Sequence, residues 1–243
     1  MKIVLITGAY KNIGFATTKL LLDLGYFVYL GARDLEKAQN AVAQLNSNNV
    51  KAIQIDITDE QSINAAKAHI AEANGKLDVL INNAGISGGF PQNPSRVDLG
   101  LVKNVFNTNF FGTIAVTTAF MDLLKASAAP RIVNVTSGLA SLTKHNDPTW
   151  KDYHIKPAAY GPSKTALNAY TVMLAFELKD TPFKVNAVDP GYTYTDFNGF
   201  RGTDPVEVAA ARIVKYGVEI DADGPTGGYF SEHNSPETGV SPW

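Results

Sequence analysis

The chain of 243 residues contains no cysteine, which excludes disulfide bonds, thiolate catalysis and cysteine-ligated metal sites. No run of 18 apolar residues occurs, and the first apolar run, "IVLI", ends at Thr7-Gly8, so we expect neither a membrane span nor a signal peptide. The 21 basic and 23 acidic residues leave a formal net charge of -2, without a run of five like charges. These absences predict a cytoplasmic protein that binds small molecules, with no nucleic-acid or membrane partner.

What the chain does contain is a regular alternation of short strands and longer helices. Apolar runs of strand length are separated by helical patterns near residues 13–24, 35–46 and 60–73; a long helical stretch follows at 99–127, and a further helix carries Lys164. Continuous apolar strands between amphipathic helices are typical of a parallel sheet that is covered on both faces. The predicted fold class is therefore α/β: a single-domain Rossmann-type doubly wound parallel sheet of about seven strands flanked by helices. The expected strands are "KIVLIT", "YFVYLG", "KAIQID", "LDVLIN", "RIVNVTS", "FKVNAVDPG" and "GGYFSE".

Two segments, at 138–158 and 192–205, interrupt this alternation. Both are polar, aromatic and rich in turn residues, and both follow strand ends, where open parallel sheets place their ligands. No linker divides the chain, so we expect one domain over 1–243. The tail that ends at Trp243 has the composition of coil, and we assign it no role.

The segment "TGAYKNIG" follows the first strand directly and opens the first helix. Gly8 permits a sharp turn, Gly14 permits a close approach of helix and strand, and the free N–H groups of the helix start can receive a pyrophosphate. A tight turn without a ligand is the alternative reading.

Arg33 lies 19 residues after Gly14, at the end of the second strand, where an arginine would accept the 2'-phosphate of NADP. Lys11 can reach the same corner, so the pattern favours NADP(H) over NAD. A solvated surface charge is the alternative for Arg33. We interpret the next residue, Asp34, as a helix N-cap.

Tyr160 and Lys164 stand four residues apart in "AAYGPSK". On a helix this spacing places the phenol and the ammonium on one face, although an ordinary surface pair would fit it as well. Pro162 is tolerated only in the first turn of a helix, so we expect the helix to begin near Ala159 with Tyr160 at its mouth.

Seven motifs in order cover most of the chain: "TGAYKNIG", "DIT" at 56–58, "NNAG" at 82–85, "NFFG" at 109–112, "VNVTS" at 133–137, "YGPSK" at 160–164 and "DPGYTYTD" at 189–196. Together they resemble the short-chain dehydrogenase/reductase family. The resemblance implies a nicotinamide-dependent oxidoreductase whose catalytic set is Asn109, Ser137, Tyr160 and Lys164.

The resemblance also implies which residues bind the cofactor. Asp56 would meet the adenine, Asn83 and its neighbours would line the cofactor, and Thr195 would hold the nicotinamide carboxamide. The cofactor residues predicted from motif and resemblance are Gly8, Lys11, Asn12, Ile13, Gly14, Arg33, Asp56, Ile57, Asn83, Ala84, Gly85, Tyr160, Lys164, Pro190, Gly191, Thr193 and Thr195.

Two departures from the family pattern stand out. Asn12 occupies a position where the family usually has glycine, and asparagine tolerates left-handed backbone angles better than most residues. The separation of 23 residues between Ser137 and Tyr160 is longer than is common in the family and is similar to the carbonyl reductase branch. We therefore interpret 138–158 as an insertion and 192–205 as a substrate loop. Monomer, dimer and tetramer stay open, so a homo-oligomer is possible.

Reduction of a carbonyl group requires a hydride at carbon and a proton at oxygen. Tyr160 would donate the proton, with its pKa lowered by Lys164 and a positive nicotinamide. Ser137 would hydrogen-bond the developing oxyanion. The family resemblance further implies that the side chain or carbonyl of Asn109 helps to hold a water against Lys164. No metal is needed, and the histidines lack metal-ligand spacing: His69, His145, His154 and His233.

The predicted function is NADPH-dependent reduction of a small or medium apolar ketone or aldehyde to an alcohol, because aromatic residues of the expected loops suit an uncharged substrate. These are Phe90, Trp150, Tyr192, Tyr194, Phe197 and Phe200. One alternative is a 3-oxoacyl-[acyl-carrier-protein] reductase, for which basic residues near the mouth would be expected: Lys144, Lys151, Lys156 and Arg201. The other is a non-catalytic NADP-sensing regulator.

Overall fold

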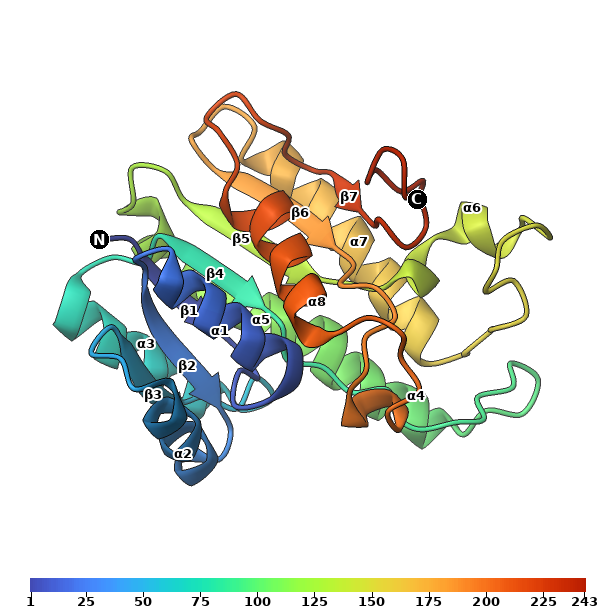
Figure 1. Ribbon diagram of the computed structural model, residues 1–243, viewed down its shortest axis with the longest axis horizontal. Helices are drawn as coiled ribbons and strands as arrows, with labels where there is room; N and C mark the ends of the chain where they lie inside the picture. The colour runs from blue at the N-terminus through green and yellow to red at the C-terminus, as the bar shows by residue number, and fades with distance from the viewer.

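The computed structural model describes residues 1–243, and its centre is a single sheet of seven parallel strands (Figure 1). The strand order is β3-β2-β1-β4-β5-β6-β7, so the direction of winding reverses between β1 and β4. The predicted doubly wound parallel sheet is confirmed. The strands are β1 (Ile3–Ile6), β2 (Phe27–Ala32), β3 (Val50–Gln54), β4 (Val79–Asn82), β5 (Arg131–Val135), β6 (Lys184–Val188) and β7 (Tyr229–Phe230).

Helices cover both faces of the sheet, and each face has its own apolar core. Along β1, Val4 and Ile6 pack on one face, whereas Ile3 and Leu5 pack on the other, because successive strand side chains alternate. Figure 1 shows α1 and α8 side by side over the first face. That face is covered by α1 (Asn12–Asp23), α2 (Leu35–Leu45) and α8 (Val206–Ile213), and the other by α3 (Glu60–Asn74), α5 (Thr113–Lys125) and α7 (Tyr160–Glu177).

The expected long helix at 99–127 is divided into three parts. The helices α4 (Leu99–Phe106) and α5 are joined by a π-helical turn, η1 (Asn107–Gly112). This turn buries Asn109 completely and leaves Phe111 exposed. The π-helical turn thus directs the Asn109 side chain into the interior, and π-helical turns often occur at functional sites. Helix α8 and a second π-helical turn, η4 (Val214–Val218), fall where the sequence patterns indicated no element.

The starts of two helices agree with prediction. Asp34 precedes α2 and accepts a hydrogen bond from the backbone N–H of Lys37 at 3.2 Å, which confirms its role as N-cap. Helix α7 begins at Tyr160 with Ala159 as its N-cap residue, and Pro162 lies in its first turn. Tyr160 therefore stands at the mouth of α7, as predicted.

The segment 138–158 contains a short 3-10 turn, η2 (Gly138–Ala140), and the single-turn helix α6 (Leu142–His145). The C-terminal tail packs against it, at the right of Figure 1. The Trp243 carbonyl accepts a hydrogen bond from the Thr143 N–H at 2.9 Å, and the imidazole of His233 lies 2.6 Å from the Asp152 carboxylate. The tail is coil as expected, but it has a structural role that the sequence did not reveal.

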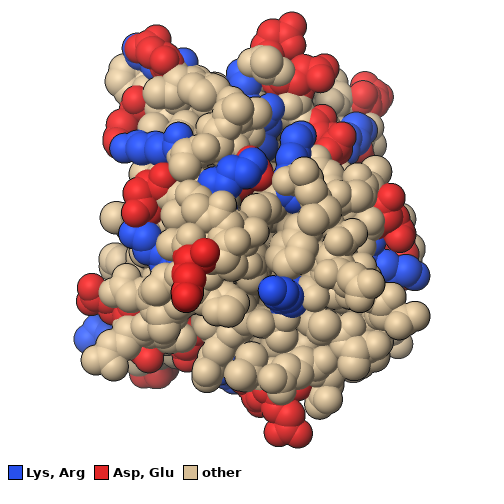
Figure 2. All heavy atoms as spheres, turned by 90° about the vertical axis from the view of Figure 1, so that its left-hand side faces the viewer, with Lys and Arg blue, Asp and Glu red and all other residues tan.

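Charged side chains of both signs are intermixed on the face shown in Figure 2, and neither sign forms a continuous field there. This distribution agrees with the small formal net charge of -2. No helix of the protein has the length and apolar content that a membrane crossing requires.

Candidate active site

The turn between β1 and α1 has the backbone geometry that its glycines predict. Gly8 has φ +63° and Asn12 has φ +50°, so the expectation that asparagine would keep the left-handed turn is confirmed. A Cβ atom added to Gly8 would lie 2.9 Å from the Cα of Ala84, and one added to Gly14 would lie 2.7 Å from Nδ2 of Asn83. Only glycine permits this close approach of α1 to the residues that follow β4.

Thr7 and Asn83 connect the β1–α1 turn to the residues that follow β4 through hydrogen bonds. The Thr7 hydroxyl accepts hydrogen bonds from the N–H groups of Asn83 and Ala84, both at 3.1 Å. In return, the Asn83 amide donates to the carbonyl oxygens of Thr7 and Gly8, both at 2.9 Å. Sequence reasoning did not single out Thr7, although it stands directly before Gly8 in the motif. The ends of β1 and β4 thus form one rigid corner at the reversal of strand order.

The expected 2'-phosphate corner holds three cations around the end of β2. Arg33 is exposed and forms no ion pair. The ammonium groups of Lys11 and Lys37 lie 5.5 and 5.9 Å from the ring centroid of Tyr10. Lys37 was not among the predicted residues; its position in the first turn of α2, close to Arg33, was the available signal.

Lys11 contacts the segment 192–205. Its ammonium forms an ion pair with Asp196, whose carboxylate also accepts a hydrogen bond from the Asn12 amide. The Lys11 ammonium holds the pKa of Asp196 below its usual value. A phosphate at this corner would therefore compete with Asp196 for Lys11.

Asp56 and Ile57 lie beyond the end of β3, where the adenine was expected. Oδ1 of Asp56 accepts hydrogen bonds from the N–H of Thr58 at 2.9 Å and from its hydroxyl at 2.7 Å, which leaves Oδ2 without a protein partner. Ile57 is buried against Gly112, where an added Cβ would lie 2.8 Å from the Ile57 carbonyl oxygen. Asp56 is thus oriented by the protein with one oxygen available to a ligand.

Three residues lie close together near the end of β4: Asn109, Gly85 and Lys164. A Cβ added to Gly85 would lie 3.2 Å from Oδ1 of Asn109 and 3.5 Å from Nζ of Lys164. Both amide hydrogens of Asn109 are taken, one by the Ile86 carbonyl at 2.9 Å and one by the Ser163 hydroxyl at 3.1 Å. The Asn109 side chain therefore anchors the loop after β4, and its amide hydrogens are not available to a water beside Lys164.

Lys164 and Tyr160 share one face of α7, as their spacing predicts. Lys164 is 4% exposed and donates a hydrogen bond to the Val135 carbonyl at 2.8 Å. Its Nζ lies 6.0 Å from the centre of the Tyr160 ring. Burial lowers the pKa of Lys164 to about 8, because the charged form is poorly solvated there.

The pKa of the Tyr160 phenol is raised in the structure. Burial raises it well above 10, the nearby Asp189 carboxylate raises it further, and hydrogen bonding with Ser137 opposes the shift. Without a bound nicotinamide the phenol pKa is thus raised, because the desolvation of the phenolate outweighs the opposing effect of Ser137. The lowering expected from Lys164 together with a positive nicotinamide stays a prediction.

Ser137 follows β5 at the same edge of the sheet. Its hydroxyl accepts a hydrogen bond from the Leu139 N–H at 3.2 Å, and its carbonyl accepts one from the Tyr229 hydroxyl at 2.7 Å. The structure thus brings Ser137, Tyr160, Lys164 and Asn109 together, as the motifs predict. The hydrogen bond from Tyr229, in β7, holds the backbone of Ser137. Tyr229 was not among the predicted residues.

The segment that follows β6 closes the site from the other side. The Asp189 carboxylate accepts from the Gly191 N–H at 3.0 Å, and the Pro190 carbonyl accepts from the Arg212 guanidinium at 2.8 Å. Thr193 and Thr195 are both buried. These contacts hold the first part of the segment 192–205 against the sheet edge.

Phe197 on this loop packs edge-on against Tyr160, with 5.5 Å between ring centroids. Tyr194 and Phe200 pack on each other at 5.2 Å and are more than half exposed. Trp150 is instead 6% exposed and packs edge-on against His145, inside the segment 138–158. Of the predicted aromatic residues, Phe197 is thus the one in direct contact with the Tyr160 ring.

The family model for short chain dehydrogenases matches residues 2–205. The chain belongs to the short-chain dehydrogenase family. It is 38% identical to the short-chain dehydrogenase anuI of Penicillium roqueforti over 226 residues, which cover 89% of this chain and 88% of that protein. It is 30% identical to salutaridine reductase of Papaver bracteatum over 95% of this chain and 94% of that protein. NADPH-bound carbonyl reductase from chicken fatty liver has a similar structure, with a TM-score of 0.85 and 25% identity over all of both chains.

As a short-chain dehydrogenase, the protein is an oxidoreductase of small molecules, in a family that uses nicotinamide cofactors. The residues present fit such a cofactor on two structural grounds. Gly8 and Gly14 leave a cradle that a Cβ atom would fill, and Asp56 keeps one carboxylate oxygen free. The predicted cofactor residues line this same edge of the sheet, from the β1–α1 turn to the segment after β6.

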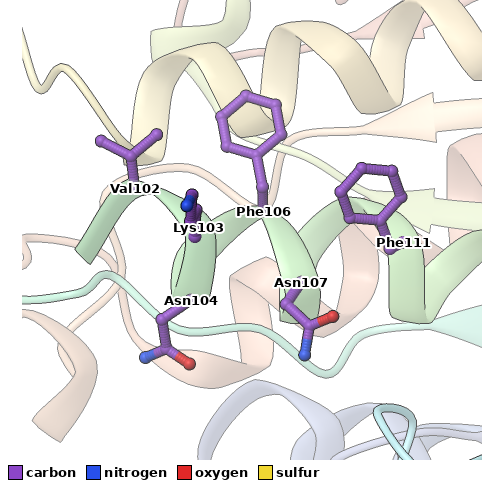
Figure 3. A pocket seen from close by; sticks show the side chains of 6 residues that line it. All are labelled: Val102, Lys103, Asn104, Phe106, Asn107 and Phe111. Carbon is purple, nitrogen blue, oxygen red and sulfur yellow. The ribbon is translucent and has the colours of Figure 1, made fainter. Parts of the chain in front are cut away.

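A hollow of 620 Å³ lies elsewhere on this dehydrogenase, along α4 and η1 (Figure 3). Its wall includes Phe111, which is 57% exposed, whereas Asn109 of the same π turn is buried on the opposite side. The hollow is therefore separate from the candidate active site. It is lined by Val102, Lys103, Asn104, Phe106, Asn107 and Phe111.

Proposed function

We propose that this short-chain dehydrogenase is an NADPH-dependent carbonyl reductase that converts a small or medium apolar ketone or aldehyde to an alcohol. The observation that carries the proposal is the grouping of Tyr160 and Ser137 at the carboxyl edge of the sheet, with Lys164 buried beside them. The aromatic ring of Phe197 against Tyr160 favours an apolar substrate. The names of two similar proteins, salutaridine reductase and the NADPH-bound carbonyl reductase, agree with this chemistry.

In this proposal each residue has a separate task. A bound nicotinamide would supply the hydride for the carbonyl carbon. The Tyr160 phenol donates a proton to the carbonyl oxygen, and the Ser137 hydroxyl donates a hydrogen bond to the same oxygen as charge develops on it. Lys164 stabilises the phenolate that remains until it is reprotonated from solvent. Phe197 limits the access of water to this pair.

The alternative substrate, an acyl group on an acidic carrier protein, would need free basic side chains near the site. Lys144 lies 3.8 Å from Asp147, and Lys156 donates to the His145 carbonyl at 2.7 Å and lies over the Tyr153 ring. Two of the basic residues considered for this role are therefore held by local contacts. This favours free carbonyl compounds as substrates.

A scan of purified protein tests the proposal. NADPH and NADH oxidation are followed in parallel with free ketones and aldehydes, and separately with 3-oxoacyl carrier protein thioesters. We expect turnover with free apolar carbonyls and NADPH. Turnover confined to the thioesters would support the acyl carrier alternative, and cofactor binding without turnover of any substrate would support the regulator.

Replacement of Arg33 by alanine tests the cofactor preference. We expect the KM for NADPH to rise about 10- to 100-fold, the scale of a lost charge-assisted hydrogen bond, while use of NADH is retained or improved. Steady-state kinetics with each cofactor measure the effect, and Lys51→Ala, at an exposed residue of β3, is the control. An unchanged KM for NADPH in Arg33→Ala would contradict the assignment.

Replacement of Asp196 by asparagine tests the competition for Lys11. The ion pair is exposed, with 44% and 43% of the two side chains accessible, so its contribution is about 0.2–1 kcal/mol. Its removal frees the Lys11 ammonium for a phosphate, and we expect NADPH to bind about two- to five-fold more tightly, with no change for NADH. Fluorescence titration of both cofactors measures this. Equal changes for NADPH and NADH would show that Lys11 does not contact the 2'-phosphate.

A further inference from the structure

Gln92 is a buried polar residue in the loop between β4 and α4. It is 3% exposed, although it lies between the exposed residues Pro91 and Asn93, in a segment (residues 83–98) that contains no helix or strand. Burial of an uncharged amide is unfavourable unless its hydrogen-bonding groups find partners. The partners of Gln92 therefore indicate why the residue is buried.

One half of the Gln92 amide caps the start of α7. Its Oε1 accepts hydrogen bonds from the backbone N–H groups of Ala159 and Tyr160, both at 3.0 Å, and the Gln92 carbonyl accepts one from the Ala158 N–H at 3.0 Å. The first N–H groups of a helix have no partner within the helix, and Ala159 has no side chain that could cap them. The cap of α7 is thus supplied from 67 residues away.

The other half of the amide closes the loop on itself. Nε2 of Gln92 donates to the carbonyls of Ser87 at 2.7 Å and Gly89 at 2.6 Å. Gly88 and Gly89 have φ values of +77° and +79°, so this turn depends on glycine. All four interactions require a side chain that both donates and accepts, which neither glutamate nor a hydrophobic residue can supply in full.

Gln92 therefore connects the loop after β4 to the first turn of α7. The loop is held at its other end by Asn109, which bonds the N–H of Ile86 at 2.8 Å and its carbonyl at 2.9 Å. Figure 1 shows the loop before α4 and the segment that leads into α7 at the same end of the molecule. Tyr160 is the first residue of α7, and the hydrogen bond from its N–H to Gln92 fixes its backbone directly.

We propose that Gln92 is a positioning residue for Tyr160: its amide fixes the first turn of α7 so that the phenol meets Ser137. This rests on the proposed function, in which Tyr160 donates the proton. A misplacement of about 1 Å in such a site lowers turnover about 100-fold. Loss of the cap should therefore reduce turnover more than cofactor binding.

Gln92→Leu removes all four hydrogen bonds and keeps a side chain of similar size. We expect kcat to fall about 10- to 100-fold, with the KM for NADPH within two-fold of wild type. Amide hydrogen exchange at Ala159 and Tyr160 should become faster, which mass spectrometry of the α7 peptide measures. The matched control is Asn186→Leu: this buried amide donates to the Pro225 carbonyl at 3.0 Å and accepts from the Gly228 N–H at 2.9 Å, ahead of β7. The control should lower stability without changing kcat.

Gln92→Glu is the second variant, because it keeps the two acceptor contacts to α7 even if the leucine variant does not fold. When protonated, the introduced carboxyl can donate to Ser87 or Gly89; when ionised, it faces both carbonyls without a proton. We expect the ratio of its kcat to that of wild type to be highest near pH 6 and to fall as the pH rises. A role confined to stability would leave this ratio constant with pH.

Wild-type kcat in folded Gln92→Leu, a kcat ratio of Gln92→Glu to wild type that does not change with pH, or an equal loss in Asn186→Leu would overturn the proposal. Unchanged exchange at Ala159 and Tyr160 in folded Gln92→Leu would overturn it as well. A wild-type protein that reduces no carbonyl compound would instead overturn the proposed function. In that case the exchange measurement would still decide whether Gln92 holds the first turn of α7.

Discussion

Tyr160→Phe should lower turnover about 100- to 10,000-fold while NADPH binding is retained, because the substitution removes only the hydroxyl that would donate the proton. The ring of phenylalanine keeps the packing on Phe197, which lies 5.5 Å from the Tyr160 ring. The measurements are kcat with a carbonyl substrate found in the scan and the dissociation constant of NADPH by fluorescence.

Tyr29→Phe is the control for this variant. The Tyr29 side chain is part of the core, and its hydroxyl donates to the Asn74 amide oxygen at 2.5 Å, remote from the site. Its loss should lower stability by about 1 kcal/mol and leave kcat unchanged. A Tyr160→Phe variant within a few-fold of wild-type turnover would exclude Tyr160 as the proton donor.

The raised pKa of Tyr160 gives the same assignment a pH dependence. A phenol whose pKa lies above its ordinary value of 10 is protonated throughout the neutral range, which is the form that reduction needs. Oxidation of the alcohol needs the phenolate, so its rate should rise with pH while that of reduction stays nearly constant from pH 6 to 8. An oxidation rate that falls as the pH rises would indicate a different proton donor.

The parts of the fold that were predictable are those in which one local rule decides. Strands buried on both faces leave unbroken apolar runs, and this is why the parallel sheet could be recognised. Gly8 and Asn12 adopt positive φ values that few other residues tolerate, and so the turn of the glycine-rich motif was also predictable. The spacing of Tyr160 and Lys164 follows from the helical repeat alone.

The contacts that were missed join side chains far apart in the chain. The Gln92 amide reaches Ala159 across 67 residues, and Lys11 reaches Asp196 across 185. Such pairs depend on the paths of two loops, which no local pattern determines. The π turn that buries Asn109 likewise follows from packing and not from helix propensity. The direction of the Tyr160 pKa required knowledge of its burial, which the sequence does not contain.

Lys164→Met should abolish most activity and yet leave the protein about as stable as wild type. We expect kcat to fall about 100- to 1,000-fold, because the cation that favours the phenolate is lost. NADPH binding should weaken too, since Lys164 is a predicted cofactor residue, and this separates the variant from Tyr160→Phe. Parallel measurements of kcat and of the NADPH dissociation constant check both effects.

The expected stability follows from two opposing contributions. Burial lowers the pKa of Lys164 from 10.5 to about 8, so keeping the lysine charged in the folded protein costs about 3 kcal/mol at neutral pH. The hydrogen bond to the Val135 carbonyl is lost in the variant, which costs about 1–3 kcal/mol because that acceptor is buried. The two nearly cancel, so the free energy of unfolding at pH 7 should stay within about 2 kcal/mol of wild type.

The pH dependence of the free energy of unfolding tests whether the lowered pKa of Lys164 offsets the lost hydrogen bond. Between pH 8 and 10.5 the unfolded wild type binds a proton that the folded protein has released, so the free energy of unfolding of the wild type rises with pH in this window. Methionine does not titrate, and the wild type should therefore gain stability relative to Lys164→Met from pH 8 upward. Denaturant unfolding of both proteins at several pH values measures the gain. Parallel curves over the window would mean that Lys164 is not held at a lowered pKa, and would remove the electrostatic part of its proposed role.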